Sequence, residues 1–297
     1  MRHGGSVLPL ARRLRIDPDD VLDLSVSLNP CAPDVVSFVR AAARTVRRYP
    51  DATHATCALA QAVGVDEERV VLTNGGAEAI ALVAARHPEG DVDAPEFSLY
   101  SRHLRRLRPG ARRWRSNPNN PTGRLAAADE SADVWDEAFF ALATGRWTRG
   151  DAGAYVVGSL TKLYACPGLR VGYTIAPDAG AAHALRTCQP EWAVDGIACE
   201  ILPRLLDVTD LASWARRTAV LRDVLVDVLR AHRLVPDASD ANYVLVREAP
   251  GLFDHLASRA VLVRDTASFG IPRGVRVAVP DEPSLARLAS ALDGYEP

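Results

Sequence analysis

Short apolar runs recur along the whole chain, and turn-forming residues separate them. Runs of about four to eight aliphatic or β-branched residues between turn residues are typical of buried strands. We expect strands over residues 21–26, 70–74, 134–136, 154–158, 168–175, 242–246, 261–265 and 275–279. A further short strand is expected before Pro95.

Between the strands, apolar positions recur with the period of a helix. The pattern predicts helices over residues 33–46, 53–64, 75–86 and 209–230, and a last helix from Pro283. The helix over 209–230 carries its apolar residues on one stripe, and we expect it to join two domains. The three strands expected after residue 230 and the last helix from Pro283 are typical of a small α+β domain.

The composition excludes several classes of protein. A chain of 297 residues that is 48% hydrophobic can bury a large core in one or two domains. The formal net charge of -2 argues against nucleic acid as the main partner. No apolar run approaches the roughly 18 residues of a membrane span, and the residues after Met1 lack the apolar segment of a signal peptide. We therefore expect a cytoplasmic protein without a membrane partner.

The cysteines and histidines predict no metal site. The five cysteines form no Cys-x-x-Cys pair, and their odd number fits reduced thiols rather than disulfides. The seven histidines show no ligand spacing.

Lys162 is the only lysine in the chain, although Lys and Arg together number 35. A guanidinium stays protonated and is no nucleophile, whereas a lysine amine can lose its proton and form a Schiff base with an aldehyde. An Arg-rich composition could also leave one lysine at a neutral surface site by chance. Lys162, however, lies on a tight turn between the strands expected at 154–158 and 168–175, which favours a covalent role.

The residues around this lysine resemble a known family. The segment 159–173 reads Ser-Leu-Thr-Lys-Leu-Tyr-Ala-Cys-Pro-Gly-Leu-Arg-Val-Gly-Tyr. It resembles the lysine motif of pyridoxal-phosphate (PLP) enzymes with the aspartate aminotransferase fold, and among them threonine-phosphate decarboxylases and histidinol-phosphate aminotransferases. The resemblance implies an α/β fold in which residues 31–205 form a large domain with a mostly parallel sheet. Residues 1–30 and 206–297 would form a small α+β domain from both chain ends.

Several residues resemble the family's contacts to the phosphate of PLP. A strand, two glycines and a helix at 70–86 would point the backbone amides of Gly76, Ala77 and Glu78 at a phosphate. Ser159 and Arg170 are suited to the same phosphate through a hydroxyl and a fork of N–H donors. In the family, a tyrosine at the position of Tyr49 reaches the cofactor of the neighbouring subunit, which implies a homodimer. Without the resemblance, a tyrosine beside a proline is more often a packed turn residue.

Three further residues resemble the family's contacts to the PLP ring. Phe97 is at the position of the aromatic residue that stacks on the ring. Asn120, in the loop Asn117-Pro-Asn-Asn-Pro-Thr-Gly123, would donate to the ring hydroxyl. Asp136 would keep the ring nitrogen protonated, which lets the cofactor accept electrons. Phe139 stands where most aminotransferases have a tyrosine, and this resembles the decarboxylases.

The resemblance also implies a substrate site. Arg276 would bind the α-carboxylate of the substrate, and Arg264 would bind a substrate phosphate. The alternative for each is a charged side chain in solvent. His3, in the segment His3-Gly4-Gly5, and Asn29, before Pro30, would close over the substrate.

The centre of the chain departs from the family pattern. The interval 97–117 is short by a strand and a helix, and the interval 123–136 is abbreviated too, so we expect a sheet of fewer than seven strands. Seven arginines lie between Arg102 and Arg115. We interpret them as a solvated helix face rather than a nucleic-acid site.

The function that the sequence favours is a PLP-dependent decarboxylase. Its substrate would be a phosphorylated amino acid such as threonine phosphate, in cobalamin biosynthesis. One alternative is an aminotransferase of the histidinol-phosphate type, which shares nearly every cofactor contact. Another is a PLP-fold protein that binds cofactor or a partner without turnover.

Overall fold

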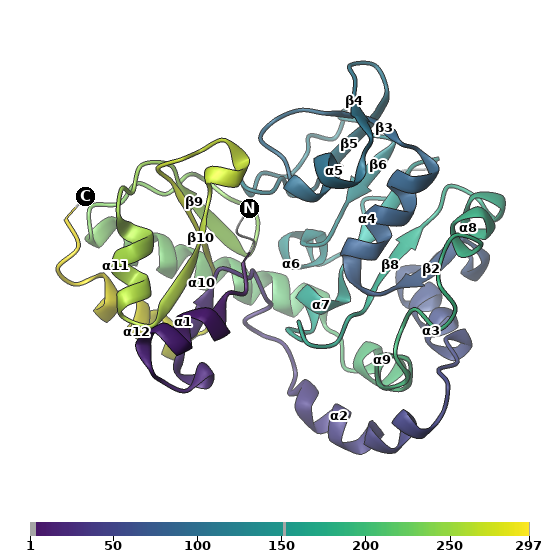
Figure 1. Ribbon diagram of the computed structural model, residues 1–297, viewed down its shortest axis with the longest axis horizontal. Coiled ribbons are helices and arrows are strands. Elements are labelled where there is room, and N and C mark those ends of the chain that lie inside the picture. Colours follow the sequence, from purple (N-terminus) through teal and green to yellow (C-terminus); the bar gives the residue numbers. More distant parts are fainter. Residues whose placement is uncertain (1–3, 151–152, 297) are drawn as a thin grey trace.

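The computed structural model describes residues 4–150 and 153–296. His3 therefore lies outside the described residues. The chain forms two sheets, each covered by helices, in two lobes that lie side by side (Figure 1). Across the two described ranges, no helix combines the length and the apolar character that crossing a membrane requires.

The larger sheet has seven strands, and all but one run parallel to each other. Only β8 is antiparallel to its neighbours. In spatial order the strands are β2 (Val70–Thr73), β8 (Gly172–Ile175), β7 (Tyr155–Gly158), β6 (Val134–Asp136), β5 (Arg112–Ser116), β3 (Glu89–Val92) and β4 (Arg106–Leu107). The predicted mostly parallel sheet is confirmed.

The prediction of fewer than seven strands is wrong, because the shortening falls on the connections rather than on the strands. Residues 117–133, all of which the structure describes, contain no helix between β5 and β6. In the next connection, described at 137–150 and 153–154, the only helix is the five-residue α6 (Phe140–Thr144). The two-residue strand β4 is enough to complete the sheet at its edge.

Helices cover both faces of the larger sheet. One apolar core lies between the sheet and α4 (Gly75–Arg86), α5 (Ser98–His103) and α8 (Ala179–Arg186). On the other face, a second core lies against α2 (Val35–Ala42), α3 (Thr53–Val63), α6, α7 (Leu160–Leu163) and α9 (Gly196–Asp207). Short 3-10 helices occur at Pro18–Asp20, Ala43–Arg47, Glu67–Arg69 and Ala267–Phe269.

The smaller sheet joins the two ends of the chain. Its order is β1 (Leu22–Leu24), β10 (Val261–Asp265), β11 (Val275–Ala278) and β9 (Tyr243–Val246). The N-terminal strand β1 is parallel to β10, and the other pairs are antiparallel. Its helices are α1 (Val7–Leu14), α10 (Leu211–Ala231), α11 (Leu252–Ser258) and α12 (Glu282–Leu292). The long helix α10 packs on β9 and α12 and also on α6 of the other lobe (Figure 1). The domain limits at residues 30 and 205 stay a prediction.

The arginines between Arg102 and Arg115 do not lie on one helix face, so that interpretation is wrong. The chain turns at Pro109-Gly110, and four of these arginines belong to the strands β4 and β5. Strand pairing brings them opposite acidic residues from other segments. The ion pairs are Arg106 and Arg108 with Glu89, Arg112 with Asp133, Arg113 with Asp93 and Glu130, and Arg115 with Glu96 and Glu130.

Candidate active site

Most of the predicted site residues follow the carboxyl ends of strands in the larger sheet. Gly75 and Gly76 follow β2, Asp136 ends β6, and Lys162 comes shortly after β7. Strands β2, β6 and β7 point the same way, because β2 and β7 are both antiparallel to β8. Their carboxyl ends therefore meet at one edge of the sheet, where open α/β sheets bind ligands.

Lys162 lies in the short helix α7, in a largely buried position. Burial lowers the pKa of Lys162 to about 8, and the positive charges of Arg276 and Arg170 add to this effect. The carboxylates of Asp23 and Asp136 act in the opposite direction. Roughly a tenth of the amine is therefore unprotonated at pH 7, far more than for a solvated lysine, and a nucleophilic lysine needs this form.

Asn29 is hydrogen-bonded to the end of α7, next to Lys162. Its backbone N donates to the carbonyl of Lys162 at 3.0 Å, and its side-chain Nδ2 donates to the carbonyl of Leu163 at 2.9 Å. Its Oδ1 accepts from the backbone N of Cys31 at 2.8 Å. These contacts join the N-terminal segment to α7, and the substrate contact expected for Asn29 stays a prediction.

Asp136 is buried at the end of β6, with 8% of the residue exposed. The hydroxyl of Tyr100 donates to Oδ2 at 2.8 Å, and the backbone N of Ala138 donates to Oδ1 at 3.0 Å. Burial raises the pKa of Asp136, while these hydrogen bonds and the nearby Lys162 lower it. The carboxylate is thus fixed in orientation and can accept a proton or an N–H group from a ligand.

Glycines allow a close approach of backbone at the start of α4. A Cβ atom added to Gly172 would lie 2.6 Å from both the carbonyl carbon of Gly75 and the N of Gly76. A Cβ on Gly75, whose φ is +74°, would collide with the guanidinium of Arg170. The first amides of this 12-residue helix have no partner within the helix, so they can bind an anion.

Ser159 and Arg170 lie beside these amides. A Cβ on Gly76 would be 3.5 Å from the Cβ of Ser159, which places the hydroxyl next to the helix start. The side chain of Glu78 caps the helix, because its Oε2 accepts from the backbone N of Asn74 at 2.7 Å. The structure therefore brings Ser159 and Arg170 together with the first amides of α4, as the predicted phosphate site requires.

Arg276 connects the smaller sheet to this site. Its Nη1 donates to Oδ1 of Asn120 at 2.5 Å, and its Nη2 donates to the carbonyl of Ser25 at 3.3 Å. The guanidinium carbon lies 4.5 Å from the centre of the Tyr243 ring. Arg276 is only 6% exposed, and burial lowers its pKa to about 10. Its Nε is buried and has no hydrogen-bond partner among the described residues, so the group can still bind an anion.

Arg264 is the neighbour of Arg276 on the next strand. The two residues are register partners on β10 and β11. Nη2 of Arg264 donates to Ser268 Oγ at 2.9 Å, and the guanidinium lies 5.4 Å from the Phe269 ring centre.

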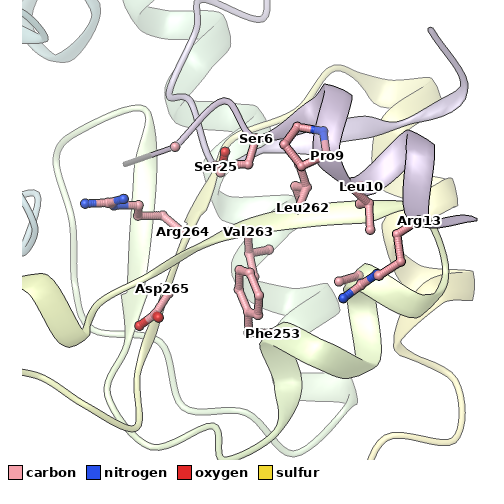
Figure 2. A pocket seen from close by; sticks show the side chains of 12 residues that line it. Ser6, Pro9, Leu10, Arg13, Ser25, Phe253, Leu262, Val263, Arg264 and Asp265 are labelled. Carbon is pink, nitrogen blue, oxygen red and sulfur yellow. The ribbon is translucent and has the colours of Figure 1, made fainter. Parts of the chain in front are cut away.

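A pocket of about 360 Å³ borders Arg264 and Ser25. Figure 2 shows Arg264 at one end of its lining and Arg13 at the other, with apolar side chains such as Phe253 and Leu262 between them.

Two predicted aromatic contacts have different surroundings. Phe97 is half-buried before α5 and makes an edge contact with Tyr100, at 5.9 Å between ring centres. Tyr49 is 78% exposed, and its ring lies 4.4 Å from that of Trp192. An exposed aromatic pair is compatible with the contact to a neighbouring subunit that the resemblance implies for Tyr49.

Sequence reasoning missed several side chains that contact the predicted ones. Tyr100 bonds to Asp136, and Tyr243 packs on Arg276 and donates to the carbonyl of Asn119 at 2.9 Å. A buried acid, Glu96, also lies here. The sequence could have indicated this residue, because a charged side chain between Pro95 and Phe97 is unusual.

The comparison with known proteins shows the family. The profile described as aminotransferase class I and II matches residues 114–292, more than half of the chain. The chain therefore belongs to this family of PLP-dependent enzymes. We call the close-packed glycines at the starts of α4 and β8 the phosphate cradle (Gly75, Gly76 and Gly172). The phosphate cradle and the buried Asp136 fit this cofactor, because they offer amides for its phosphate and a carboxylate for its ring nitrogen.

Two curated relatives are similar over almost the whole chain. One is a histidinol-phosphate aminotransferase of Halobacterium salinarum, 29% identical over 359 positions, covering 98% of this chain and 95% of the relative. The other is the threonine-phosphate decarboxylase of Salmonella typhimurium, 29% identical over 359 positions, covering 99% and 98%. Because this chain has only 297 residues, both relatives contain segments that it lacks.

A solved structure shows the same fold. The histidinol-phosphate aminotransferase of Sinorhizobium meliloti, in complex with pyridoxal 5'-phosphate, superimposes with a TM-score of 0.83 at 18% identity. The match covers 96% of this chain and 92% of that chain. The predicted aspartate aminotransferase fold is thereby confirmed.

Proposed function

We propose that this enzyme decarboxylates a small phosphorylated amino acid such as threonine phosphate. The observation that carries the proposal is the pair of buried guanidinium groups, Arg276 and Arg264, on neighbouring strands. Threonine phosphate has a carboxylate and a phosphate, and two adjacent cations match these two anionic groups. Arg276 lies close enough to Lys162 to lower the pKa of the amine, so the substrate site adjoins the lysine.

The cofactor is held by residues from several strand ends in this proposal. PLP, when bound, supplies an electron sink for the electrons of a bond at the substrate α-carbon. The phosphate would be held by the amides of Gly76, Ala77 and Glu78, by Ser159 and Arg170, and by Tyr49 of a second subunit. Phe97 would pack on the ring, Asn120 would donate to the ring hydroxyl, and Asp136 would accept from the ring nitrogen.

Lys162 has two tasks. Its amine would hold the cofactor at the aldehyde carbon, and Nζ would also be placed to move a proton at the substrate α-carbon. Lys162 is only partly exposed, and burial lowers the pKa of its amine. Arg276 and Arg264 meanwhile fix the substrate, and the bond that breaks depends on how its carboxylate is held.

The N-terminal segment supports decarboxylation over amino-group transfer. Gly4 packs so closely on the carbonyl of Ser25 that a Cβ would lie 2.5 Å from it, and the N of Gly5 donates to Ser25 Oγ at 2.9 Å. The same Ser25 carbonyl accepts from Arg276. The segment His3-Gly4-Gly5 resembles the start of the decarboxylases, and its described residues, Gly4 and Gly5, contact the same Ser25 as the proposed substrate arginine.

The second candidate function is a histidinol-phosphate type of aminotransferase. It is supported by the relatives, because several further similar proteins, besides the one named above, are histidinol-phosphate aminotransferases. A non-catalytic role is disfavoured because Lys162, Asp136, Asn120 and Arg170 are all present.

The test is release of carbon dioxide from L-threonine O-phosphate by the PLP-loaded protein without any 2-oxo acid. We expect catalytic release, and none from the Lys162→Arg variant. If no carbon dioxide appears, but amino groups pass from histidinol phosphate to a 2-oxo acid, the aminotransferase alternative is correct. Absence of both reactions despite bound PLP would support the non-catalytic alternative.

The cellular setting remains part of the proposal. We propose a homodimer in the cytoplasm, acting in cobalamin biosynthesis, without nucleic acid, membrane or metal as partner. The homodimer follows from the role given to Tyr49, and the pathway follows from the proposed substrate.

A further inference from the structure

A second buried carboxyl group lies beside the candidate site. Glu96, between β3 and α5, is 8% exposed. Its Oε1 accepts from the backbone N of Ser116 at 3.0 Å, and its Oε2 accepts from the Ser116 hydroxyl. Burial raises the pKa of Glu96 to about 7, so this group changes charge near neutral pH.

Ser116 connects Glu96 with Asn120. It ends β5 as the register partner of Asp136 on β6, and its Oγ accepts from the backbone N of Asn120 at 2.8 Å. Asn120 in turn accepts from Arg276. A chain of hydrogen bonds therefore runs from Glu96 to the proposed substrate arginine.

Tyr100 lies between Glu96 and Asp136. Its hydroxyl donates to Asp136, and burial first, then the charges of Asp136 and Glu96, raise the pKa of Tyr100. A hydrogen bond with Ser116 acts in the opposite direction. The Ser116 hydroxyl thus adjoins both Asn120 and Tyr100.

We propose that Glu96 is a positioning residue whose protonation state sets the hydrogen bonds of Asp136 and Asn120 through Ser116 and Tyr100. The inference rests on the proposed function, in which Asp136 and Asn120 contact the cofactor ring. An ionised Glu96 takes the single hydroxyl proton of Ser116. A protonated Glu96 donates to Ser116 instead, so that Ser116 can donate to Tyr100 and strengthen its hydrogen bond to Asp136.

Other charged groups also face Glu96. Arg115 on β5 has its Nε 3.6 Å from Oε1 of Glu96 and its Nη1 2.7 Å from Oε1 of Glu130. A hydrogen bond with Asn119, in the loop after β5, also lowers the pKa of Glu96. The charge of Glu96 in turn raises the pKa of Tyr243 on β9. Because Arg115 is shared with Glu130, it compensates the charge of Glu96 only in part.

The experiment compares Glu96→Gln with the matched control Glu130→Gln. Glu130 pairs with the same Arg115, but its carboxylate accepts from the backbone N of Ala127 rather than from Ser116. The visible absorbance of the PLP-loaded protein is titrated from pH 5 to 9, and the dissociation constant of PLP is measured at each pH. We expect Glu96→Gln to remove the component of both curves near pH 7 or shift it by about one pH unit. Glu130→Gln should keep this component in both curves and move it only slightly to lower pH, because Arg115 is then free to compensate the charge of Glu96.

Unaltered curves in Glu96→Gln would overturn the inference, and so would equal shifts in the two variants. If Glu96→Gln does not fold, Ser116→Ala provides the second test, because it keeps the carboxyl group and removes the connecting hydroxyl. We expect the component near pH 7 to disappear there too, and its persistence would overturn the inference. A wild-type protein that binds no PLP would instead refute the proposed function.

Discussion

Arg276 and Arg264 are direct neighbours across the antiparallel strands β11 and β10, and both are buried. Like charges in such a pair repel each other. No carboxylate pairs with Arg276 among the residues that the structure describes; it contacts Asn120, the Ser25 carbonyl and the Tyr243 ring instead. The buried charge of Arg276 favours an anionic ligand at this place, since a buried charge without a carboxylate partner is costly.

Replacing Arg276 with glutamine should therefore weaken substrate binding. A hydrogen bond to a charged group contributes about 1.5–3 kcal/mol, so we expect KM for threonine phosphate to rise about 10- to 100-fold. The measurement is initial rate against substrate concentration. Arg247→Gln is a suitable control, because Arg247 pairs with Asp237 in an exposed position. An unchanged KM in Arg276→Gln would contradict the assignment.

The pKa of Lys162 can be measured directly, because the chain has a single lysine. Protein labelled with ¹³Cε-lysine gives one lysine resonance, and Lys162→Arg should remove it. In the cofactor-free protein we expect this resonance to titrate near pH 8, and to titrate at higher pH in Arg276→Gln, which loses a neighbouring positive charge. A value near 10.5 would show that the amine is solvated.

Adding a methyl group at Gly172 should disturb the phosphate cradle. The new Cβ would meet backbone atoms of Gly75 and Gly76, and such overpacking costs about 1–3 kcal/mol. We expect Gly172→Ala to weaken PLP binding by about 10-fold or more, measured by titration of the cofactor-free protein. Gly168→Ala, in the loop before β8, is the control, because its Cβ would have no described neighbour within 4 Å. Equal affinities for the two variants would refute the cradle.

Glu96 should make stability depend on pH. Its pKa rises from 4.5 to about 7 on folding, so the native state binds more protons between these values. The stability linked to this group is fully present below about pH 4.5 and is lost as pH rises to 7, with a loss on the order of 3 kcal/mol. We expect the unfolding free energy of wild type to fall relative to that of Glu96→Gln over this range, measured by denaturant unfolding of the cofactor-free proteins. If the two unfolding free energies depend on pH in the same way, the raised pKa of Glu96 is excluded.

Tyr49 tests the proposed homodimer. We expect Tyr49→Ala to keep its stability, because the side chain is exposed, but to lose cofactor affinity. Mixing it with Lys162→Ala subunits should restore activity, since a mixed dimer has one site with both a normal lysine and a normal tyrosine. Mass spectrometry would show whether the two variants exchange subunits. If they do and the mixture still has no activity, the two subunits do not share a site.

Much of the fold could be predicted from the sequence. The strands β7 and β10 and the long helix α10 lie where the apolar pattern placed them, because local periodicity reports which residues are buried. The number of strands could not be predicted in this way. Strand β4 has only two residues, both exposed, and it exists because β3 provides its hydrogen-bond partners. The same pairing brought the arginines of β4 and β5 opposite acids that lie elsewhere in the sequence.

The sequence by itself indicated the residues of the lysine segment, Ser159, Lys162 and Arg170. They lie within a short stretch of the chain, so covalent connectivity keeps them near one another. Only the tertiary structure decided which distant residues complete the site. Asn120 and Arg276 are 156 positions apart, and their hydrogen bond exists because the two sheets meet at that edge. The connection of Glu96 to Asp136 through Ser116 and Tyr100 likewise depends on strand register. Side-chain contacts of this kind follow from packing in three dimensions, which the hydrophobic pattern does not specify.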